Sequence, residues 1–162
     1  MSTKVTPGSE PAFEDEYIAK ITQIFEELIV FNRVIGLKIV HIGTDRAHAR
    51  IAMHNDLVGH FTTGRVHGGV ISAALDTTGG LAVMAAIGAR HMDETPMQRL
   101  MRFAKLGTID LRVDYLRPAL GEVFEVHAEV LRLGSRVAST RMEFRGADGK
   151  LFSTGSAAYM VS

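Results

Sequence analysis

Apolar residues recur at helical spacing in the first part of the chain. Between Glu14 and Asn32 they return every three or four positions, and acidic residues fill the expected first turn, where the helix dipole favours negative charge. This pattern predicts a helix that ends at Gly36. Residues 1–12, which precede it, are polar, carry two prolines and are expected to form a flexible tail.

Polar and apolar residues alternate over much of the remaining chain, which is typical of half-buried strands. Six strands are predicted, at residues 37–43, 46–53, 109–115, 124–130, 138–144 and 151–160. The short connections between successive strands favour an antiparallel sheet. Residues 54–66, which follow the second strand, are expected to form an irregular loop.

The longest apolar segment covers about residues 67–88 and is apolar on nearly all sides, so it predicts a buried helix. Residues 89–107 form an excursion with a second helix, for which Thr95 is the candidate N-cap and Pro96 the first residue. The order of elements predicts an α+β fold, in which an antiparallel sheet of about six strands wraps around the long helix. We expect a single domain over residues 13–162.

The composition excludes several functional classes. The 162 residues carry 18 Lys and Arg against 18 Asp and Glu, so no net basic field exists to attract nucleic acid or a membrane. The absence of cysteine excludes disulfides and thiolate chemistry, and the seven histidines lack metal-ligand spacing, so we expect no metal site. The N-terminus lacks an apolar signal segment, and no 18 apolar residues are uninterrupted. A soluble cytoplasmic protein is therefore expected.

Asp76 is the one full charge within the long apolar segment. A buried carboxylate is costly and is usually either paired or functional. Asp76 is therefore a candidate general base or nucleophile. The alternative is a structural role, in which Asp76 bonds to Thr77, Thr78 or a neighbouring strand.

The same helix begins with His67, Gly68 and Gly69. Backbone N–H groups at a helix N-terminus are unpaired and carry a partial positive charge, and glycines let a ligand oxygen approach them closely. Such donors polarise a carbonyl group and stabilise an oxyanion. The alternative is that the two glycines only ease the turn into the helix.

Gly68 and Asp76 are poorly arranged to serve one substrate from one helix. They are eight residues apart, which corresponds to about 12 Å along the helix axis and about 80° around it. A second copy of the helix, antiparallel across a two-fold axis, would bring Asp76 of one chain beside Gly68 of the other. The spacing therefore predicts a dimer with two equivalent sites.

The segment VHGGVISAALDTTGG resembles the His-Gly-Gly and Asp signature of hotdog-fold acyl-CoA thioesterases of the PaaI type, in the 4-hydroxybenzoyl-CoA thioesterase superfamily. The following strands, in GTIDLRVDYLRPALGEVFEVHAEVLRLGSRVA, look like those of the same family. The segment FNRVIG, the block QRLMRFAKLGTIDLRVDYLRP and the ending AAYMV are most similar to its YigI-type medium/long-chain members. The resemblance covers about residues 25–162.

This resemblance implies a hotdog fold and dimers that usually pair into tetramers. It also implies hydrolysis of an acyl-CoA thioester in fatty acid metabolism, without a metal and with coenzyme A present only as part of the substrate. By motif, Gly68 would supply the oxyanion N–H, with Gly69 beside it in the catalytic motif, and His67 would order that loop or contact the substrate. Asp76 would act from the partner subunit, and Thr108 stands where relatives carry a Ser or Thr that positions water.

One position departs from the family pattern. Many relatives have an asparagine six residues before the histidine of the motif, where this chain has Phe61, and the neighbouring His60 is the candidate replacement. For the phosphates of coenzyme A, the candidates are Arg65 and the turn that holds Gly134, Ser135 and Arg136. The alternative is that these cations are ordinary solvated surface.

Other functions stay open at this stage. The excursion at residues 89–107 is the candidate segment for acyl-chain choice, and the residues alone do not decide between fatty and aryl substrates. A non-catalytic acyl-CoA-binding or sensing protein is one alternative, because a fold does not determine a function. A hydratase or dehydratase is another, although its His-and-acid motif is not found here.

Overall fold

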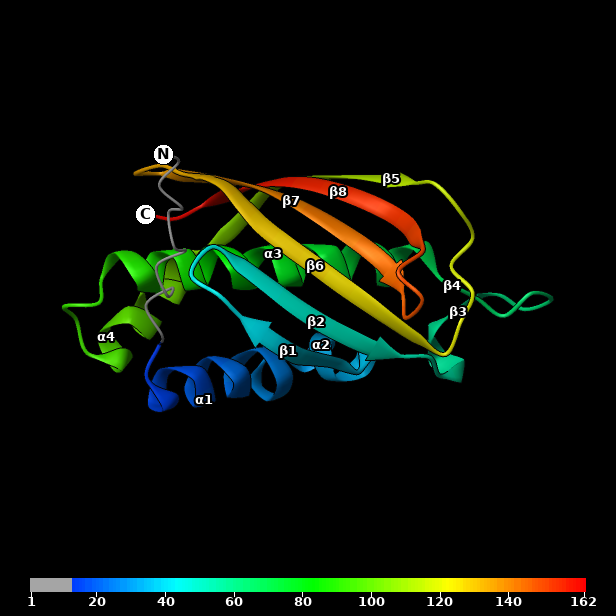
Figure 1. Cartoon of the computed structure of the whole chain (residues 1–162), viewed down its shortest axis with the longest axis horizontal. Helices are drawn as coiled ribbons and strands as arrows, with labels where there is room; N and C mark the ends of the chain where they lie inside the picture. Colours follow the sequence, from blue (N-terminus) through cyan, green and yellow to red (C-terminus); the bar gives the residue numbers. More distant parts are fainter. Residues whose placement is uncertain (1–12) are drawn as a thin grey trace, which may run out of the picture.

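The computed structural model describes residues 13–162 (Figure 1). A six-stranded antiparallel sheet in the order β1-β2-β6-β7-β8-β5 forms its main layer. The strands are β1 (Leu37–Ile42), β2 (Arg46–Ala52), β5 (Gly107–Tyr115), β6 (Val123–Leu133), β7 (Val137–Gly146) and β8 (Leu151–Met160). The predicted α+β fold with about six strands is confirmed, whereas the predicted tail at residues 1–12 lies outside the described residues.

The long helix α3 (Gly68–Arg90) packs against β2, β6 and β7. Figure 1 shows it running behind the strands of the sheet, with α1 and α2 beside β1. By length and composition α3 could cross a membrane, but most of it is buried within the chain. It is the core helix that the apolar segment predicts.

Side chains from alternating positions on the strands form the core with α3. Ala47, Ala49 and Ile51 of β2 are buried, as the alternating pattern predicts. On the neighbouring strands, the rings of Phe124 and Phe144 stack with their centroids 5.2 Å apart. This core holds α3 rigidly, and α3 carries most of the candidate site.

The predicted N-terminal helix is interrupted. It consists of α1 (Asp15–Gln23), a π-helical segment η1 (Ile24–Leu28) and α2 (Val30–Ile35), with an extended residue, Ile29, before α2. The side chain of Asn32 is buried, and its Nδ2 donates a hydrogen bond to the Phe25 carbonyl oxygen at 2.8 Å. A side chain that bonds to a helix carbonyl in this way competes with regular helical bonding. The periodicity of the apolar residues does not reveal such a break.

Residues 54–66 are more ordered than the predicted irregular loop. They form a 3-10 turn η2 (Asn55–Leu57) and a short hairpin of β3 (Val58–His60) and β4 (Arg65–Val66). The hairpin folds back onto the start of α3, because the His67 N–H donates to the Leu57 carbonyl oxygen at 2.8 Å. A Cβ at Gly59 would lie 2.4 Å from the His67 Cα, so this close approach requires a glycine. Strands this short carry too few residues for an alternating pattern to be recognised.

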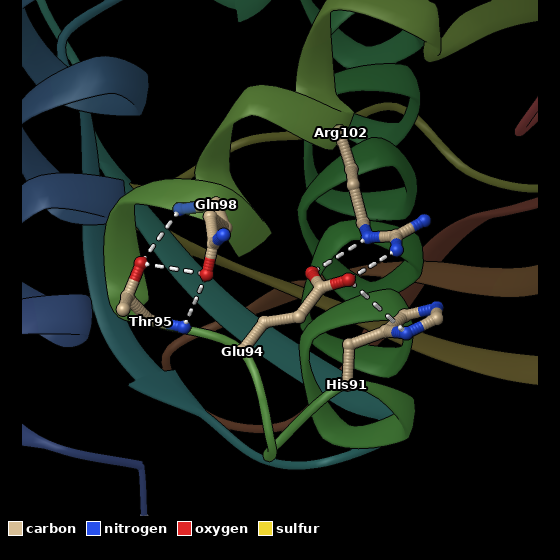
Figure 2. A network of polar contacts seen from close by, with 5 residues as sticks. All are labelled: His91, Glu94, Thr95, Gln98 and Arg102. Carbon is tan, nitrogen blue, oxygen red and sulfur yellow. Dashed lines mark hydrogen bonds and ion pairs between the residues drawn. The ribbon is translucent and has the colours of Figure 1, made fainter.

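The excursion after α3 contains α4 (Pro96–Met101) and a 3-10 segment η3 (Arg102–Lys105). Thr95 caps α4 as predicted: its side chain accepts from the Gln98 N–H, and the Gln98 side chain accepts from the Thr95 N–H (Figure 2). This capping box fixes the start of the second helix at the predicted residue.

Candidate active site

His67 caps the N-terminus of α3. Its backbone is extended, and its ring Nδ1 accepts a hydrogen bond from the Gly69 N–H at 2.8 Å. A Cβ at Gly69 would lie 2.9 Å from this nitrogen, so the cap depends on a glycine there. The Gly69 N–H is therefore occupied by the cap, and Nδ1 is the unprotonated ring nitrogen.

Gly68 is the first residue of α3, and its N–H finds no acceptor within residues 13–162. Tyr115 fixes the peptide group that follows Gly68, because its hydroxyl donates a hydrogen bond to the Gly68 carbonyl oxygen at 2.8 Å. A cavity of about 360 Å³ opens here, with Arg65, Gly68 and Tyr115 among its lining residues. An unpaired N–H at a helix N-terminus is suited to a carbonyl oxygen or an oxyanion.

Asp76 is half-buried on α3 and is held from two strands. Its Oδ1 accepts a hydrogen bond from the Thr108 hydroxyl on β5 at 2.9 Å. Its carbonyl oxygen accepts from the hydroxyl of the buried Tyr159 on β8 at 2.8 Å. Burial raises the pKa of Tyr159 far above its ordinary range, and the nearby Asp76 carboxylate adds to this effect. Tyr159 thus remains a neutral donor that fixes the backbone beneath the carboxylate.

The structure brings Thr108 and Asp76 together but keeps Gly68 apart from Asp76. Asp76 does not line the cavity at Gly68, and the two residues are about two turns apart on one helix. The side of α3 that bears Gly69, Ser72, Ala73, Asp76 and Thr77 is exposed or only half-buried, whereas residues 78–88 are buried. The N-terminal half of the core helix therefore presents an uncovered side with the candidate carboxylate near its C-terminal end.

The hairpin before α3 projects from the body of the molecule (Figure 1). At its tip, the ring of Phe61 is 92% exposed and stacks on His60 at a centroid distance of 5.9 Å. The ring Nδ1 of His60 bonds to the hydroxyl of Thr62 at 2.8 Å. Neither His60 nor Phe61 lines the cavity at Gly68, while Arg65 does.

A second cavity, of about 510 Å³, lies at the C-terminal end of α3. Gly134 and Ser135 line it together with three cationic side chains, Arg90, Arg102 and Lys105. Arg90 ties this turn to the helix, because its guanidinium donates to the carbonyl oxygens of Leu133 and Gly134. Among the predicted phosphate ligands, Arg136 is exposed and does not line this cavity, and Arg65 lies at the other end of α3.

His91, Glu94 and Arg102, which line this second cavity, form a network of polar contacts (Figure 2). Arg102 donates two hydrogen bonds to the Glu94 carboxylate, one of them at 3.0 Å, and His91 Nδ1 lies 3.8 Å from the same carboxylate. The Arg102 guanidinium holds the pKa of Glu94 below its usual value. Arg90, Arg102 and Lys105 line the cavity against one carboxylate side chain, that of Glu94, so the cavity carries excess positive charge, which suits phosphate groups.

Tyr115, Tyr159 and Asn32 contact the candidate site and were not predicted from the sequence. Each acts through a hydrogen bond to a segment far away in the chain: Tyr115 to Gly68, Tyr159 to Asp76, and Asn32 to the Thr77 hydroxyl at 3.0 Å. No spacing rule connects such partners. For Tyr159, the sequence carries one signal, the glycine pair on α3. A Cβ at Gly79 would lie 2.3 Å from the tyrosine hydroxyl.

Metal ligands are not grouped in the described part of the chain. Within residues 13–162, no cluster of three or more His, Asp or Glu side chains is arranged to hold a metal ion.

His48 and His127 lie together on the sheet with their rings stacked 4.2 Å apart. Burial and the neighbouring His48 lower the pKa of His127.

The chain is similar to known proteins over most of its length. Residues 63–153 match the family model described as the thioesterase superfamily. The chain is 34% identical to the medium/long-chain acyl-CoA thioesterase YigI of Salmonella typhimurium over 149 residues, which cover 91% of this chain and 95% of that protein. The protein of the same name from Escherichia coli K12 is 33% identical over the same shares of both chains.

A solved structure supports the same relationship. A protein from Shewanella oneidensis, described as related to the thioesterase superfamily, superposes with a TM-score of 0.85 at 35% identity. The match covers 91% of this chain and 96% of that one. The expected hotdog fold therefore agrees with a sequence relationship and with an independent structure.

Proposed function

This chain belongs to the thioesterase superfamily, and we propose that it hydrolyses acyl-CoA thioesters to a free carboxylic acid and coenzyme A. The observation that carries the proposal is the Asp76 carboxylate, which is half-buried on the core helix and hydrogen-bonded by Thr108. The name of the YigI relatives, which specifies medium- and long-chain acyl-CoA, supports fatty acyl substrates over aryl ones.

Asp76 acts as general base or as nucleophile. As a base, it accepts a proton from a water whose oxygen attacks the thioester carbonyl carbon; the C–S bond then breaks, and the thiolate of coenzyme A takes up a proton. As a nucleophile, its carboxylate oxygen attacks the thioester carbonyl carbon, and the C–S bond breaks to release the thiolate of coenzyme A, which takes up a proton. Water then hydrolyses the resulting acyl anhydride. In both routes Thr108 orients the carboxylate, and it is also positioned to orient water beside it.

The unpaired N–H of Gly68 stabilises the oxyanion that develops on the thioester carbonyl oxygen. His67 keeps this donor in position, because its ring is bonded to the next N–H along the chain. Gly69 contributes in two ways. Its N–H donates the hydrogen bond that positions the His67 ring, and its lack of a side chain lets that ring approach closely. His60 and Phe61 lie at the exposed hairpin tip outside the cavity at Gly68, so we assign them no role at this donor.

The complete site needs two chains. Gly68 and Asp76 of one chain are about 12 Å apart along α3. The uncovered side of α3 and the edge strand β5, which bears Thr108, offer a continuous surface for a second copy. We therefore assign a homodimer with two sites, each made of Asp76 and Thr108 from one chain and Gly68 from the other. We further propose that two such dimers pair into a tetramer.

The nucleotide end of coenzyme A binds in the cavity at Gly134 and Ser135, near Arg136. The cationic side chains of Arg90 and Arg102 in that cavity support this assignment. Arg90 is 14 residues beyond Asp76 on α3, about 21 Å along the axis, a separation that an extended phosphopantetheine arm can bridge. Arg65 contributes a positive charge at the other end of the helix, beside Gly68.

The reaction uses protein groups and water alone, with coenzyme A entering as part of the substrate and no metal or separate cofactor. Backbone donors and a carboxylate supply what thioester hydrolysis requires. Turnover should therefore be unaffected by EDTA. We place the reaction in fatty acid metabolism in the cytoplasm, without a nucleic-acid or membrane partner.

The decisive test is thiol release from a panel of acyl-CoA substrates. The panel runs from butyryl-CoA to palmitoyl-CoA and includes benzoyl-CoA as the aryl case. We expect turnover that is highest on medium or long chains. Tight acyl-CoA binding without any thiol release would contradict the proposal and would favour a sensing protein, and preference for benzoyl-CoA would move the substrate class to aryl thioesters.

A further inference from the structure

The helix α2 and the end of the preceding segment η1 expose an apolar surface next to the candidate site. Four large apolar side chains within seven residues are each more than half exposed: Leu28 at 64%, Val30 at 61%, Phe31 at 57% and Val34 at 55%. We call these four residues the α2 patch. Within residues 13–162 nothing covers them, and apolar residues gathered in this way commonly mark a binding surface.

The helix α2 buries a polar side chain and exposes large apolar ones. A surface helix normally turns its apolar side inward, whereas α2 buries the amide of Asn32 together with Ile35 and leaves Phe31 and Val34 outside. Two hydrogen bonds hold this arrangement. Asn32 donates to the Phe25 carbonyl oxygen at 2.8 Å and accepts from the Thr77 hydroxyl at 3.0 Å.

These bonds fix the α2 patch beside the reacting centre. Thr77 is the residue directly after Asp76 on α3, so the bond between Asn32 and Thr77 joins α2 to α3 next to the candidate base. A substrate carbonyl attacked with the help of Asp76 must lie within about one water of its carboxylate. The chain that extends from this carbonyl then starts close to α2.

We infer that the α2 patch binds the acyl chain of the substrate, and that Phe31 and Val34 determine chain-length selectivity. This inference rests on the proposed function and adds the place of the apolar tail to it. The excursion at residues 89–107, which the sequence suggested for this role, leaves α3 beyond Arg90, about 21 Å from Asp76 along the axis. It returns to the candidate site only at its last residue, Gly107, which precedes Thr108.

The size of the effect follows from apolar burial. Each buried methylene contributes about 0.8 kcal/mol, or roughly a 4-fold change in binding. A charged side chain on the α2 patch that displaces two methylenes should therefore lower kcat/KM by about 15-fold. Only chains long enough to reach the patch should be affected.

The experiment compares Val34→Glu and Phe31→Glu with two matched controls. Val40→Glu and Leu131→Glu place the same charge on two other exposed apolar residues, which are 46% exposed on β1 and 59% exposed on β6. For each variant, kcat/KM is measured on butyryl-CoA and lauroyl-CoA, and the assembly is measured by light scattering after size exclusion. We expect the ratio of lauroyl to butyryl activity to fall by about 15-fold in both Glu variants and to stay unchanged in both controls.

Two results would overturn the inference. An unchanged ratio in the Glu variants would show that the acyl chain lies elsewhere. A smaller assembly with equal loss on both substrates would show that a second copy of the chain covers the α2 patch. Absence of turnover in the wild-type protein on every acyl-CoA would instead contradict the proposed function, so the two failures are separable.

Discussion

The hydroxyl of Thr108 donates a hydrogen bond to Oδ1 of Asp76 at 2.9 Å, although the two residues are 32 positions apart in the chain. Thr108 is the second residue of the edge strand β5, and Asp76 lies near the middle of the core helix. The bond fixes the direction of a carboxylate that would otherwise rotate freely on a half-exposed side of α3. It also leaves the second carboxylate oxygen available to a water or a thioester carbon.

Replacement of Thr108 should reduce activity through this bond. Thr108→Val removes the hydroxyl at almost constant volume, and we expect kcat to fall by roughly 10-fold, since a hydrogen bond to a charged group contributes about 1.5 kcal/mol. Thr108→Ser keeps the hydroxyl and should retain most of the activity. Steady-state thiol release on the best acyl-CoA measures both variants, and equal activity of the two would remove Thr108 from the mechanism.

Gly68 allows its N–H to be deleted with little change to the backbone. His67 has a ψ of 135°, which is the conformation that a following proline requires, and proline is tolerated at the first position of a helix. Gly68→Pro should therefore fold and should lower kcat by about 100-fold or more, as expected for the loss of an oxyanion donor. Gly68→Ala keeps the N–H and is the matched control.

One result for the variants Gly68→Pro and Gly68→Ala would contradict the role of the Gly68 N–H as oxyanion donor. A Cβ at this position would lie 3.3 Å from the Tyr115 ring, so both variants meet the same neighbour. Circular dichroism and thermal unfolding show whether each variant is folded. A folded Gly68→Pro protein with the activity of Gly68→Ala would exclude this N–H as the oxyanion donor.

The sequence predicts the parts of this site that are local and misses those that depend on folding. The helix start at His67, the isolated Asp76 and the capped helix at Thr95 all carry short-range signals, and each is found in the described structure. The break at Ile29 is missed because it depends on one buried amide, that of Asn32, bonded to a distant threonine.

The relationship of strands to the helix is likewise a property of the whole fold. That Thr108 reaches Asp76 follows from the sheet order, in which β5 is an edge strand that pairs with β8. The resemblance to thioesterases supplied Thr108 as a candidate, but neither spacing nor composition could predict its bond to the carboxylate.

Tyr159 should support both stability and activity. Tyr159→Phe removes a buried hydroxyl that donates to the Asp76 carbonyl oxygen, so we expect a loss of about 1 kcal/mol in the free energy of unfolding. The backbone at Asp76 also loses its anchor, and kcat should fall while KM changes little. Denaturant unfolding and steady-state kinetics measure the two effects; unchanged stability together with unchanged kcat would contradict this role.

Arg102 should act on the nucleotide end of the substrate only. We expect Arg102→Gln to raise KM for acyl-CoA by about 10-fold, since a hydrogen bond to a charged group contributes about 1.5 kcal/mol. The KM for an acyl-pantetheine, which lacks the phosphates, should not change. Arg33→Gln, which removes an exposed cation from α2, is the control. An equal rise for both substrates would show that Arg102 does not bind phosphate.

The central claim is that each site combines Asp76 of one chain with Gly68 of another. Asp76→Asn and Gly68→Pro should each reduce thiol release by at least about 100-fold. When the two variants are co-expressed in equal amounts, random pairing leaves both wild-type residues in about one quarter of the sites. Measurement of thiol release by this mixture should therefore give about 25% of the wild-type rate. A mixture no more active than either variant alone would contradict the account.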